Sequence, residues 1–179
     1  AVLEGVATSF PQTEEIIDNG KVSGMTAADV QKILNLKHAW EFILDKDVIA
    51  SRSDYYMLSY IAKLVNEGFF AEGGRIRGVP VTIGGSSYIP PLPNEADVKD
   101  MIQKITEEND EAITIAIKLC LYCMKTQIFL DGNKRASVIA NLEVMEISVS
   151  FIPIKPATFS VEKIYPSSLS DFERLHIFE

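Results

Sequence analysis

The chain has 179 residues, of which 47% are hydrophobic, and this length and composition predict one domain with a substantial core. Its formal net charge of −8 argues against nucleic acid or an anionic membrane as a partner, because both select for basic surfaces. Lys118 and Lys125 interrupt the longest apolar run before it reaches the roughly 18 residues of a membrane-spanning helix, and no secretory signal is visible, so we expect a cytoplasmic protein.

Six segments carry the apolar periodicity and the cap residues of helices. They cover residues 1–18, 26–44, 53–66, 94–105, 110–125 and a stretch from residue 133 onward. Thr26, Ser53 and Asn94 are the predicted N-caps, since each side chain can accept a backbone N–H bond at a helix start. The chain thus divides into an N-terminal segment, residues 1–25, and one mainly helical domain, residues 26–179.

Residues 73–93 are rich in glycine and proline and predict a short β-hairpin. Side chains alternate along its first strand, which includes Val79, Val81, Thr82 and Ile83. Pro80 has no backbone donor, so this strand should lie at an edge, and Gly84-Gly85 supplies the turn into residues 86–89. An edge strand can accept an extended peptide by strand addition, although a plain surface hairpin fits the same pattern.

Residues 127–135, Gln-Ile-Phe-Leu-Asp-Gly-Asn-Lys-Arg, form a short polar junction between two predicted helices. The free N–H groups and positive dipole end of the second helix favour an anion, and Lys134 and Arg135 add positive charge. The Asp131 carboxylate suits a Mg²⁺ ion that also binds phosphate oxygens. The junction is either a site for a nucleotide polyphosphate with its metal, or a plain turn before a solvated helix start.

Neither the cysteines nor the histidines predict a further site. Cys120 and Cys123 have the spacing of a metal or redox pair, but structural zinc needs four ligands and both lie in an apolar helical pattern. Core packing is the better interpretation, and reduced thiols suit a cytoplasmic protein. His38 lies in a helical pattern and His176 near the end of the sequence, and we expect structural or surface roles for both.

The junction resembles the signature of the Fic/Doc (Fido) family, which runs His-x-Phe-x-Asp/Glu-Gly-Asn-Gly/Lys-Arg. The matching positions are Phe129, Asp131, Gly132, Asn133, Lys134 and Arg135. One position differs, because Gln127 stands where the family carries the histidine that deprotonates the target hydroxyl. Residues 74–93 are similar to the flap of Fic proteins, which precedes the signature and clamps the target segment.

The resemblance implies a mainly α fold, the Fido-type helical bundle with a short β-hairpin flap, over residues 26–179. Its implied catalytic set is Gln127 beside the incoming hydroxyl, Asp131 as the Mg²⁺ ligand and Arg135 at the outer phosphates. The implied nucleotide-binding residues for ATP, the substrate, are Gly132, Asn133, Lys134 and Arg135. Many family members carry a second arginine where this chain has Val138, which weakens the case for a fully held γ-phosphate.

The implied reaction is the transfer of AMP from Mg·ATP to a hydroxyl side chain of a target protein that docks on the flap. Because the Gln127 amide cannot take up a proton near neutral pH, we expect this adenylyltransferase (AMPylation) activity to be weakened. A second interpretation, from a different class, is a nucleotide-binding pseudoenzyme or interaction module. A third is Doc-like protein phosphorylation by the toxin of a toxin–antitoxin pair, to which Lys134 points.

Regulation and assembly stay open at this point. Residues 8–15 stand where many Fic proteins carry an inhibitory helix, but they do not match its motif, so we do not expect autoinhibition. A homodimer is among the expectations, and the sequence does not name the target protein.

Overall fold

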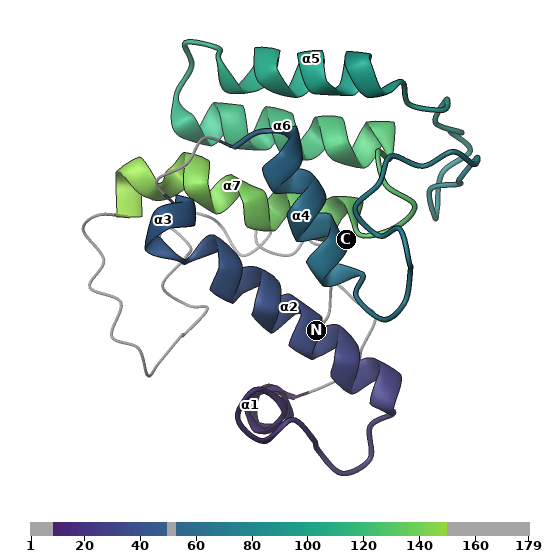
Figure 1. Cartoon of the computed structure of the whole chain (residues 1–179), viewed down its shortest axis with the longest axis vertical. Helices are drawn as coiled ribbons and strands as arrows, with labels where there is room; N and C mark the ends of the chain where they lie inside the picture. Colours follow the sequence, from purple (N-terminus) through teal and green to yellow (C-terminus); the bar gives the residue numbers. More distant parts are fainter. Residues whose placement is uncertain (1–8, 50–52, 150–179) are drawn as a thin grey trace. The chain divides into compact units, whose positions relative to one another are not determined.

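The computed structural model describes residues 9–49 and 53–149 of the chain, and these residues contain α-helices and no β-strand. The helices are α1 (Phe10–Asn19), α2 (Ala27–Ile43), α3 (Lys46–Ile49), α4 (Tyr55–Val65), α5 (Glu95–Thr106), α6 (Ala112–Thr126) and α7 (Asn133–Val149), as Figure 1 shows. The chain divides into two units, Ala1–Ile147 and Ser148–Glu179, and the features below belong to the first. The mainly helical fold predicted from the sequence is confirmed.

Side-chain caps fix the starts of α2, α4 and α5, and two of these three caps are the predicted ones. The Thr26 hydroxyl accepts a hydrogen bond from the Asp29 N–H (3.1 Å), and Asn94 Oδ1 accepts one from the Ala96 N–H (2.9 Å). The prediction that Ser53 caps α4 is wrong, because Asp54 Oδ1 accepts the bond from the Met57 N–H (2.8 Å). Ser53 is buried instead, and its hydroxyl donates to the Ala140 carbonyl of α7 (3.2 Å).

The first predicted helix is confirmed where the structure describes it. Ser9 and Gln12 form a capping box at the start of α1, and Gly20 ends the helix with a left-handed φ of 70°. Residues 1–8, which the prediction also included, lie outside the described residues. Buried Ile16 of α1 packs against Ile33 of α2, so α1 is joined to the rest of this unit through α2.

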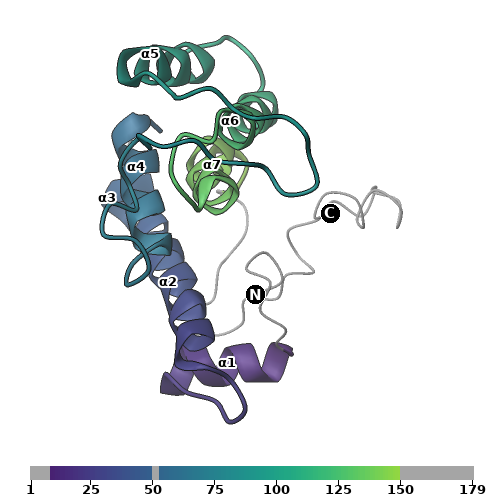
Figure 2. The same ribbon diagram turned by 90° about the vertical axis from the view of Figure 1, so that its right-hand side faces the viewer.

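One hydrophobic core joins five helices and the 127–135 loop. Helix α2 packs against α4, and α5 lies beside α6, as the two views in Figures 1 and 2 show. The buried core residues are Ala39, Ile43, Leu58, Ile61, Ala62, Val65, Val98, Ile102, Ile105, Ile115, Leu119, Cys123, Ile128, Phe129, Ala136, Ile139 and Ala140. Ile128 and Phe129 belong to the loop and are fully buried, so the loop is anchored from inside the core.

The predicted β-hairpin is not confirmed. Within the described residues, the segment 77–93 has no β-ladder, although the turn at Gly84-Gly85 is present and brings the Ser86 N–H to the Ile83 carbonyl (3.1 Å). The pairing near it is an isolated antiparallel bridge between Ile76 and Phe129. Four prolines between residues 80 and 93 remove backbone donors, and a lone two-stranded hairpin is at best marginal, so the segment stays an extended loop.

Helix α7 confirms the helix predicted from residue 133. Ala136 and Ile139 are buried in the core, as the periodicity indicates. In the part of the chain that the structure describes, no helix has both the length and the apolar character needed to cross a membrane.

Candidate functional site

The 127–135 loop links the end of α6 to the start of α7. Gln127 ends α6 in a left-handed conformation (φ 50°, ψ 63°), and its N–H donates to the Cys123 carbonyl (2.9 Å). Buried Phe129 then pins the middle of the loop in the core, and Gly132 turns the chain into α7 with a φ of 78°. The polar residues of the loop are thus presented between two fixed helix ends.

The side chain of Gln127 is used at both ends of its amide. Its Nε2 donates to the Met124 carbonyl (2.6 Å), and its Oε1 accepts a hydrogen bond from Asn133 Nδ2 (3.1 Å). The first bond satisfies a carbonyl in the last turn of α6, where intrahelical donors run out. Gln127 therefore closes the loop and caps the helix in this conformation.

Asn133 is the second closing residue. Its side chain exchanges a pair of hydrogen bonds with the backbone of Phe129, accepting from the N–H (2.9 Å) and donating to the carbonyl (2.8 Å). The residue is only 4% exposed. Its amide is thus committed to loop structure, and its backbone at the first turn of α7 is the part that faces a ligand most readily.

Asp131 and Arg135 form an ion pair across the first turn of α7. Arg135 Nη2 donates to Asp131 Oδ2 (2.9 Å), with the Asp131 side chain half exposed and the Arg135 side chain 11% exposed. Arg135 Nη1 also donates to the Val65 carbonyl (3.2 Å), and Asp131 Oδ1 accepts from the Gly132 N–H (2.6 Å). The two charges that a metal-bound phosphate would need are therefore adjacent and, in this conformation, neutralise each other.

The start of α7 supplies further positive potential. The first N–H groups of any helix have no acceptor inside it, and the helix dipole places partial positive charge at this end. Lys134 is part-buried beside Arg135, and its carbonyl accepts a hydrogen bond from the Ser137 hydroxyl (3.0 Å). This end of α7 is therefore suited to an anion.

Asn66 supports the loop from α4 and was not predicted from the sequence. Its Nδ2 donates to the carbonyls of Ala62 (2.9 Å) and Asp131 (2.9 Å), and it is 1% exposed. A Cβ on Gly132 would lie 2.8 Å from this Nδ2 and 2.9 Å from Val65 Cγ2. The residue that packs against the glycine is 66 positions away in sequence, and no local pattern could have indicated it.

Comparisons with known proteins agree with this arrangement. A sequence model of the Fic/DOC family matches residues 53–145, just over half of the chain. The chain belongs to the Fic/DOC family. The matched residues run from the start of α4 into α7, so they include Asn66, the 77–93 segment and the whole 127–135 loop.

Solved structures of Fic proteins share the fold of this family member. Residues 134–508 of Fic-1 from C. elegans are 22% identical with a TM-score of 0.68, and the match covers 82% of this chain and 46% of that one. A Fic family protein from Desulfovibrio desulfuricans G20 is 19% identical with a TM-score of 0.68, covering 82% of this chain and 45% of that one. This Fic-family chain thus spans less than half the length of each. No curated protein sequence matches it.

At the 127–135 loop, Asp131 is the side chain that could bind a divalent cation. No group of three or more His, Cys, Asp or Glu side chains gathers within residues 9–49 and 53–149. Asp131 is a single, half-exposed carboxylate, and each of its oxygens keeps acceptor capacity beyond the bond it already makes. Mg²⁺ is commonly bound by one carboxylate together with phosphate oxygens and water, so the residues fit that mode.

The side chain of Arg77 connects the predicted flap residues to the 127–135 loop. Val79, at the start of the extended segment, is 52% exposed, and its carbonyl accepts a hydrogen bond from Arg77 Nη1 (2.8 Å). Arg77 Nε in turn donates to the Gln127 carbonyl (2.5 Å). The structure therefore joins the 79–83 segment to the 127–135 loop, although it does not form the predicted strand.

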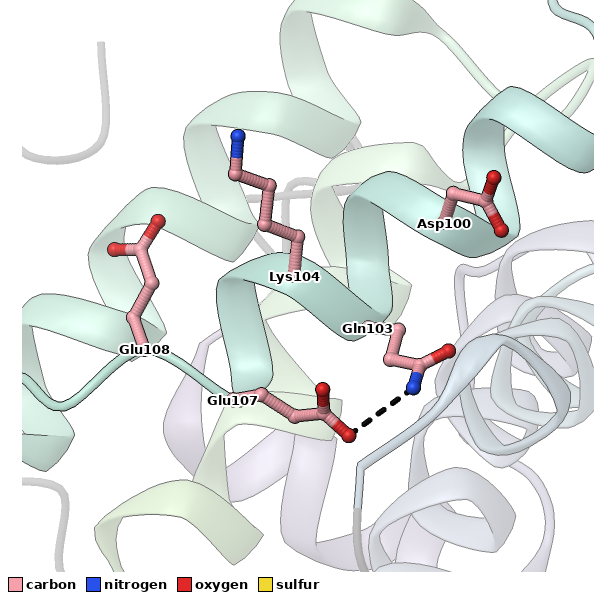
Figure 3. Close-up of a pocket in the computed structure, with 5 residues that line it drawn as sticks. All are labelled: Asp100, Gln103, Lys104, Glu107 and Glu108. Carbon is pink, nitrogen blue, oxygen red and sulfur yellow. Dashed lines mark hydrogen bonds between the residues drawn. The ribbon is translucent and has the colours of Figure 1, made fainter.

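The remaining polar features do not join this site. An open hollow of about 410 Å³ at the end of α5 is lined by Asp100, Gln103, Lys104, Glu107 and Glu108 (Figure 3). Gln103 Nε2 donates to Glu107 across it (3.1 Å), and no residue of the loop contributes to it. Its lining is that of a solvated helix end.

Cys123 packs in the core, as predicted, whereas Cys120 is only partly buried. Cys123 of α6 is fully buried, and burial raises the pKa of its thiol above the ordinary range. The Cys120 sulfur lies 3.4 Å from the Ser137 hydroxyl of α7. Both cysteines are free thiols, and His38 is exposed on α2.

Proposed function

We propose that the 127–135 loop binds Mg·ATP and that the chain transfers AMP slowly to a hydroxyl side chain of a target protein. The observation that carries this proposal is the Asp131–Arg135 pair at the N-terminus of α7, in a chain of the Fic/DOC family. A metal-binding carboxylate and a phosphate-binding guanidinium stand side by side at an anion-favouring helix end.

Binding would exchange the partners within this pair. Arg135 would leave Asp131 for the outer phosphates, Asp131 would hold the Mg²⁺, and Lys134 would add positive charge. The backbone of Gly132 and Asn133 would meet the α-phosphate region. The metal, when bound, offsets the negative charge of the phosphate oxygens.

Gln127 sets the expected rate. We propose that it occupies the position at which Fic proteins carry the histidine base, beside the incoming hydroxyl. The hydroxyl oxygen would bond to the α-phosphorus as pyrophosphate leaves, and its proton would pass to water, because an amide accepts none near neutral pH. General base help is worth about two to four orders of magnitude, so we expect transfer to be slower by that order.

The proposed target is a protein segment that lies along residues 79–83. This segment has no ladder partner within the described residues. Its Val79 and Ile83 carbonyls already accept hydrogen bonds from Arg77 and Ser86, and we propose that the backbone between them pairs with an extended peptide. The acidic chain, with a net charge of −8, favours a protein partner over nucleic acid.

A second function is nucleotide binding without transfer, as a pseudoenzyme or interaction module. The observation that favours it is the engagement of both ends of the Gln127 amide, with Met124 and with Asn133. In that arrangement both ends of the Gln127 amide already serve the structure of the loop. The chain would then keep a nucleotide-binding site without catalysing transfer.

Intact-mass spectrometry after incubation with Mg·ATP separates these functions. The wild-type chain and Gln127→His are compared, with Asp131→Asn in the Gln127→His background as control. We expect a slow AMP-sized adduct on the wild type and a faster one on Gln127→His, lost in the control. An adduct on Gln127→His alone favours the pseudoenzyme, a phosphate-sized adduct favours Doc-like phosphorylation, and no adduct on either protein contradicts transfer.

A further inference from the structure

Arg77 is a buried cation at the junction of the 77–93 segment and the end of α6. It is 4% exposed, and its guanidinium donates only to backbone carbonyls among the described residues. The acceptors are those of Gln127 (2.5 Å), Pro91 (2.7 Å), Val79 (2.8 Å), Pro90 (3.3 Å) and Thr126 (3.4 Å). The Arg77 N–H adds a bond to the Ile128 carbonyl (3.0 Å).

These contacts are unusual in their chemistry. A buried charge ordinarily has a carboxylate partner, because desolvating an unpaired ion is costly. Here the compensation comes from carbonyl dipoles, two of which belong to Thr126 and Gln127 at the end of α6, where the helix dipole is negative. Burial lowers the pKa of Arg77, yet a guanidinium stays protonated in proteins.

The geometry also requires arginine in particular. The planar fork of a guanidinium can donate in several fixed directions at once, whereas a lysine ammonium offers one point of attachment. Arg77 uses its Nε toward Gln127, one Nη toward Val79 and the other toward Pro91. One side chain thus joins both ends of residues 79–91 to the residue that closes the loop.

The other end of the loop has a separate support. Asn66 holds the Asp131 carbonyl from α4, and Arg135 binds the Val65 carbonyl of the same helix. Arg77 makes no bond to Asp131 or Arg135, and Asn66 makes none to Gln127. The Asp131–Arg135 pair therefore has a support in α4 that is separate from Arg77, and the hydrogen bond between Gln127 and Asn133 (3.1 Å) joins the two ends of the loop.

We propose that Arg77 is the positioning residue that fixes residues 79–91 against Gln127, so that it governs target docking and transfer but not nucleotide binding. The part concerning docking and transfer rests on the proposed function. The anchoring of residues 79–91 does not, because it follows from the contacts alone. Arg77 touches no reacting atom and acts through the backbone of Gln127.

The anchor is tested by ¹⁵N NMR on the wild type, Arg77→Gln and Arg77→Lys. Arg75→Gln is the matched control, since Arg75 lies two residues earlier with a side chain that is 74% exposed. In the wild type we expect residues 79–91 to be as rigid as the helices by their heteronuclear NOE. Arg77→Gln should lower those NOE values and shift the signals of residues 126–128, Arg77→Lys should do so less, and Arg75→Gln should change neither.

Adduct formation and Mg·ATP binding are measured with the Arg77→Gln substitution placed in the Gln127→His background. We expect Arg77→Gln in the Gln127→His background to slow adduct formation by about tenfold or more, with the Kd for Mg·ATP within about twofold of wild type. Asn66→Ala should have the opposite pattern of effects. It should weaken the binding of Mg·ATP, while residues 79–91 stay as rigid as in the wild type.

Three results would overturn the proposal. One is an unchanged NOE profile in Arg77→Gln, and another is a loss of Mg·ATP affinity as large as the loss of transfer. The third is loss of helical circular dichroism in both Arg77 variants, since Arg77 would then support the whole domain. If the wild type binds no nucleotide, the proposed function fails, and the NOE profile still decides whether Arg77 anchors the segment.

Discussion

At residue 132 the backbone conformation and the surrounding space both require glycine. The φ of 78° lies in the left-handed region, and an added Cβ would be 2.8 Å from Asn66 Nδ2. The neighbouring Asp131–Arg135 pair depends on this turn, because Gly132 supplies the carbonyl that begins the hydrogen bonding of α7, to the Ala136 N–H (2.8 Å). A single residue without a side chain thus sets the geometry of the proposed phosphate site.

Gly132→Ala should destabilise the protein by more than backbone strain alone. A left-handed alanine costs about 1–2 kcal/mol, and the contacts with Asn66 and Val65 add to that cost. Gly85→Ala is the matched control, since Gly85 has a φ of 74° but nothing within 4 Å of its Cβ position. Urea denaturation measures both, and equal losses of unfolding free energy would show that the space around Gly132 is not restrictive.

Some contacts between site residues could be predicted from the sequence, and others could not. Asp131 and Arg135 are four positions apart at a helix start, so their pairing follows from helix geometry. Asn66 and Arg77 contact the loop across 65 and 50 positions of sequence. Such contacts depend on how helices pack, which local patterns do not encode.

At the level of elements, helix α6 connects the core to the site. Its buried face includes Leu119 and Cys123, and its last turn is capped by Gln127. Sequence periodicity predicted this helix and its neighbours, because a buried stripe and a cap residue are local signals. It missed the α4 cap by one residue, since Ser53 and Asp54 are both good caps and only burial of Ser53 against α7 decides between them.

The predicted β-hairpin is not confirmed, because strand pairing depends on more than a local pattern. Alternation in residues 79–83 is a local signal for a strand, but a strand needs a partner, and the prolines leave few donors for one. The segment is held by the Arg77 side chain instead of by a ladder.

Burial of Cys123 in α6 should make stability depend on pH above neutrality. Its thiol has a raised pKa in the folded protein, so the unfolded chain loses this proton first, near the ordinary value of about 8.5. The contribution of the protonated Cys123 thiol to the free energy of unfolding is complete below that pH. Above it, this contribution falls by up to about 1.4 kcal/mol per pH unit.

Unfolding free energies measured between pH 8 and 9.5 give this slope. Cys123→Ala should flatten the slope, whereas Cys120→Ala, a substitution one turn away in the same helix, should keep it. Identical slopes in wild type and Cys123→Ala would contradict the account of a buried, protonated thiol.

For the molecule as a whole, the family match and the fold agree. The chain has the fold of Fic proteins with which it shares 19–22% identity, and it spans less than half the length of those chains. Its own residues therefore have to show what the site does. They give the two ends of the loop separate supports, Asn66 at the proposed phosphate site and Arg77 at the proposed target side, and the Gln127–Asn133 hydrogen bond joins these ends.

Isothermal titration calorimetry with Mg·ATP tests the central claim, that a nucleotide site persists in this loop without a histidine base. The wild type and Gln127→His should bind with Kd values within about threefold of each other, and Asp131→Asn should weaken binding by about tenfold or more. Asp110→Asn, the same change at the opposite end of α6 where Asp110 pairs with Lys118, should leave the Kd unchanged. Absence of binding by the wild type, or binding that Asp131→Asn leaves intact, would contradict the account.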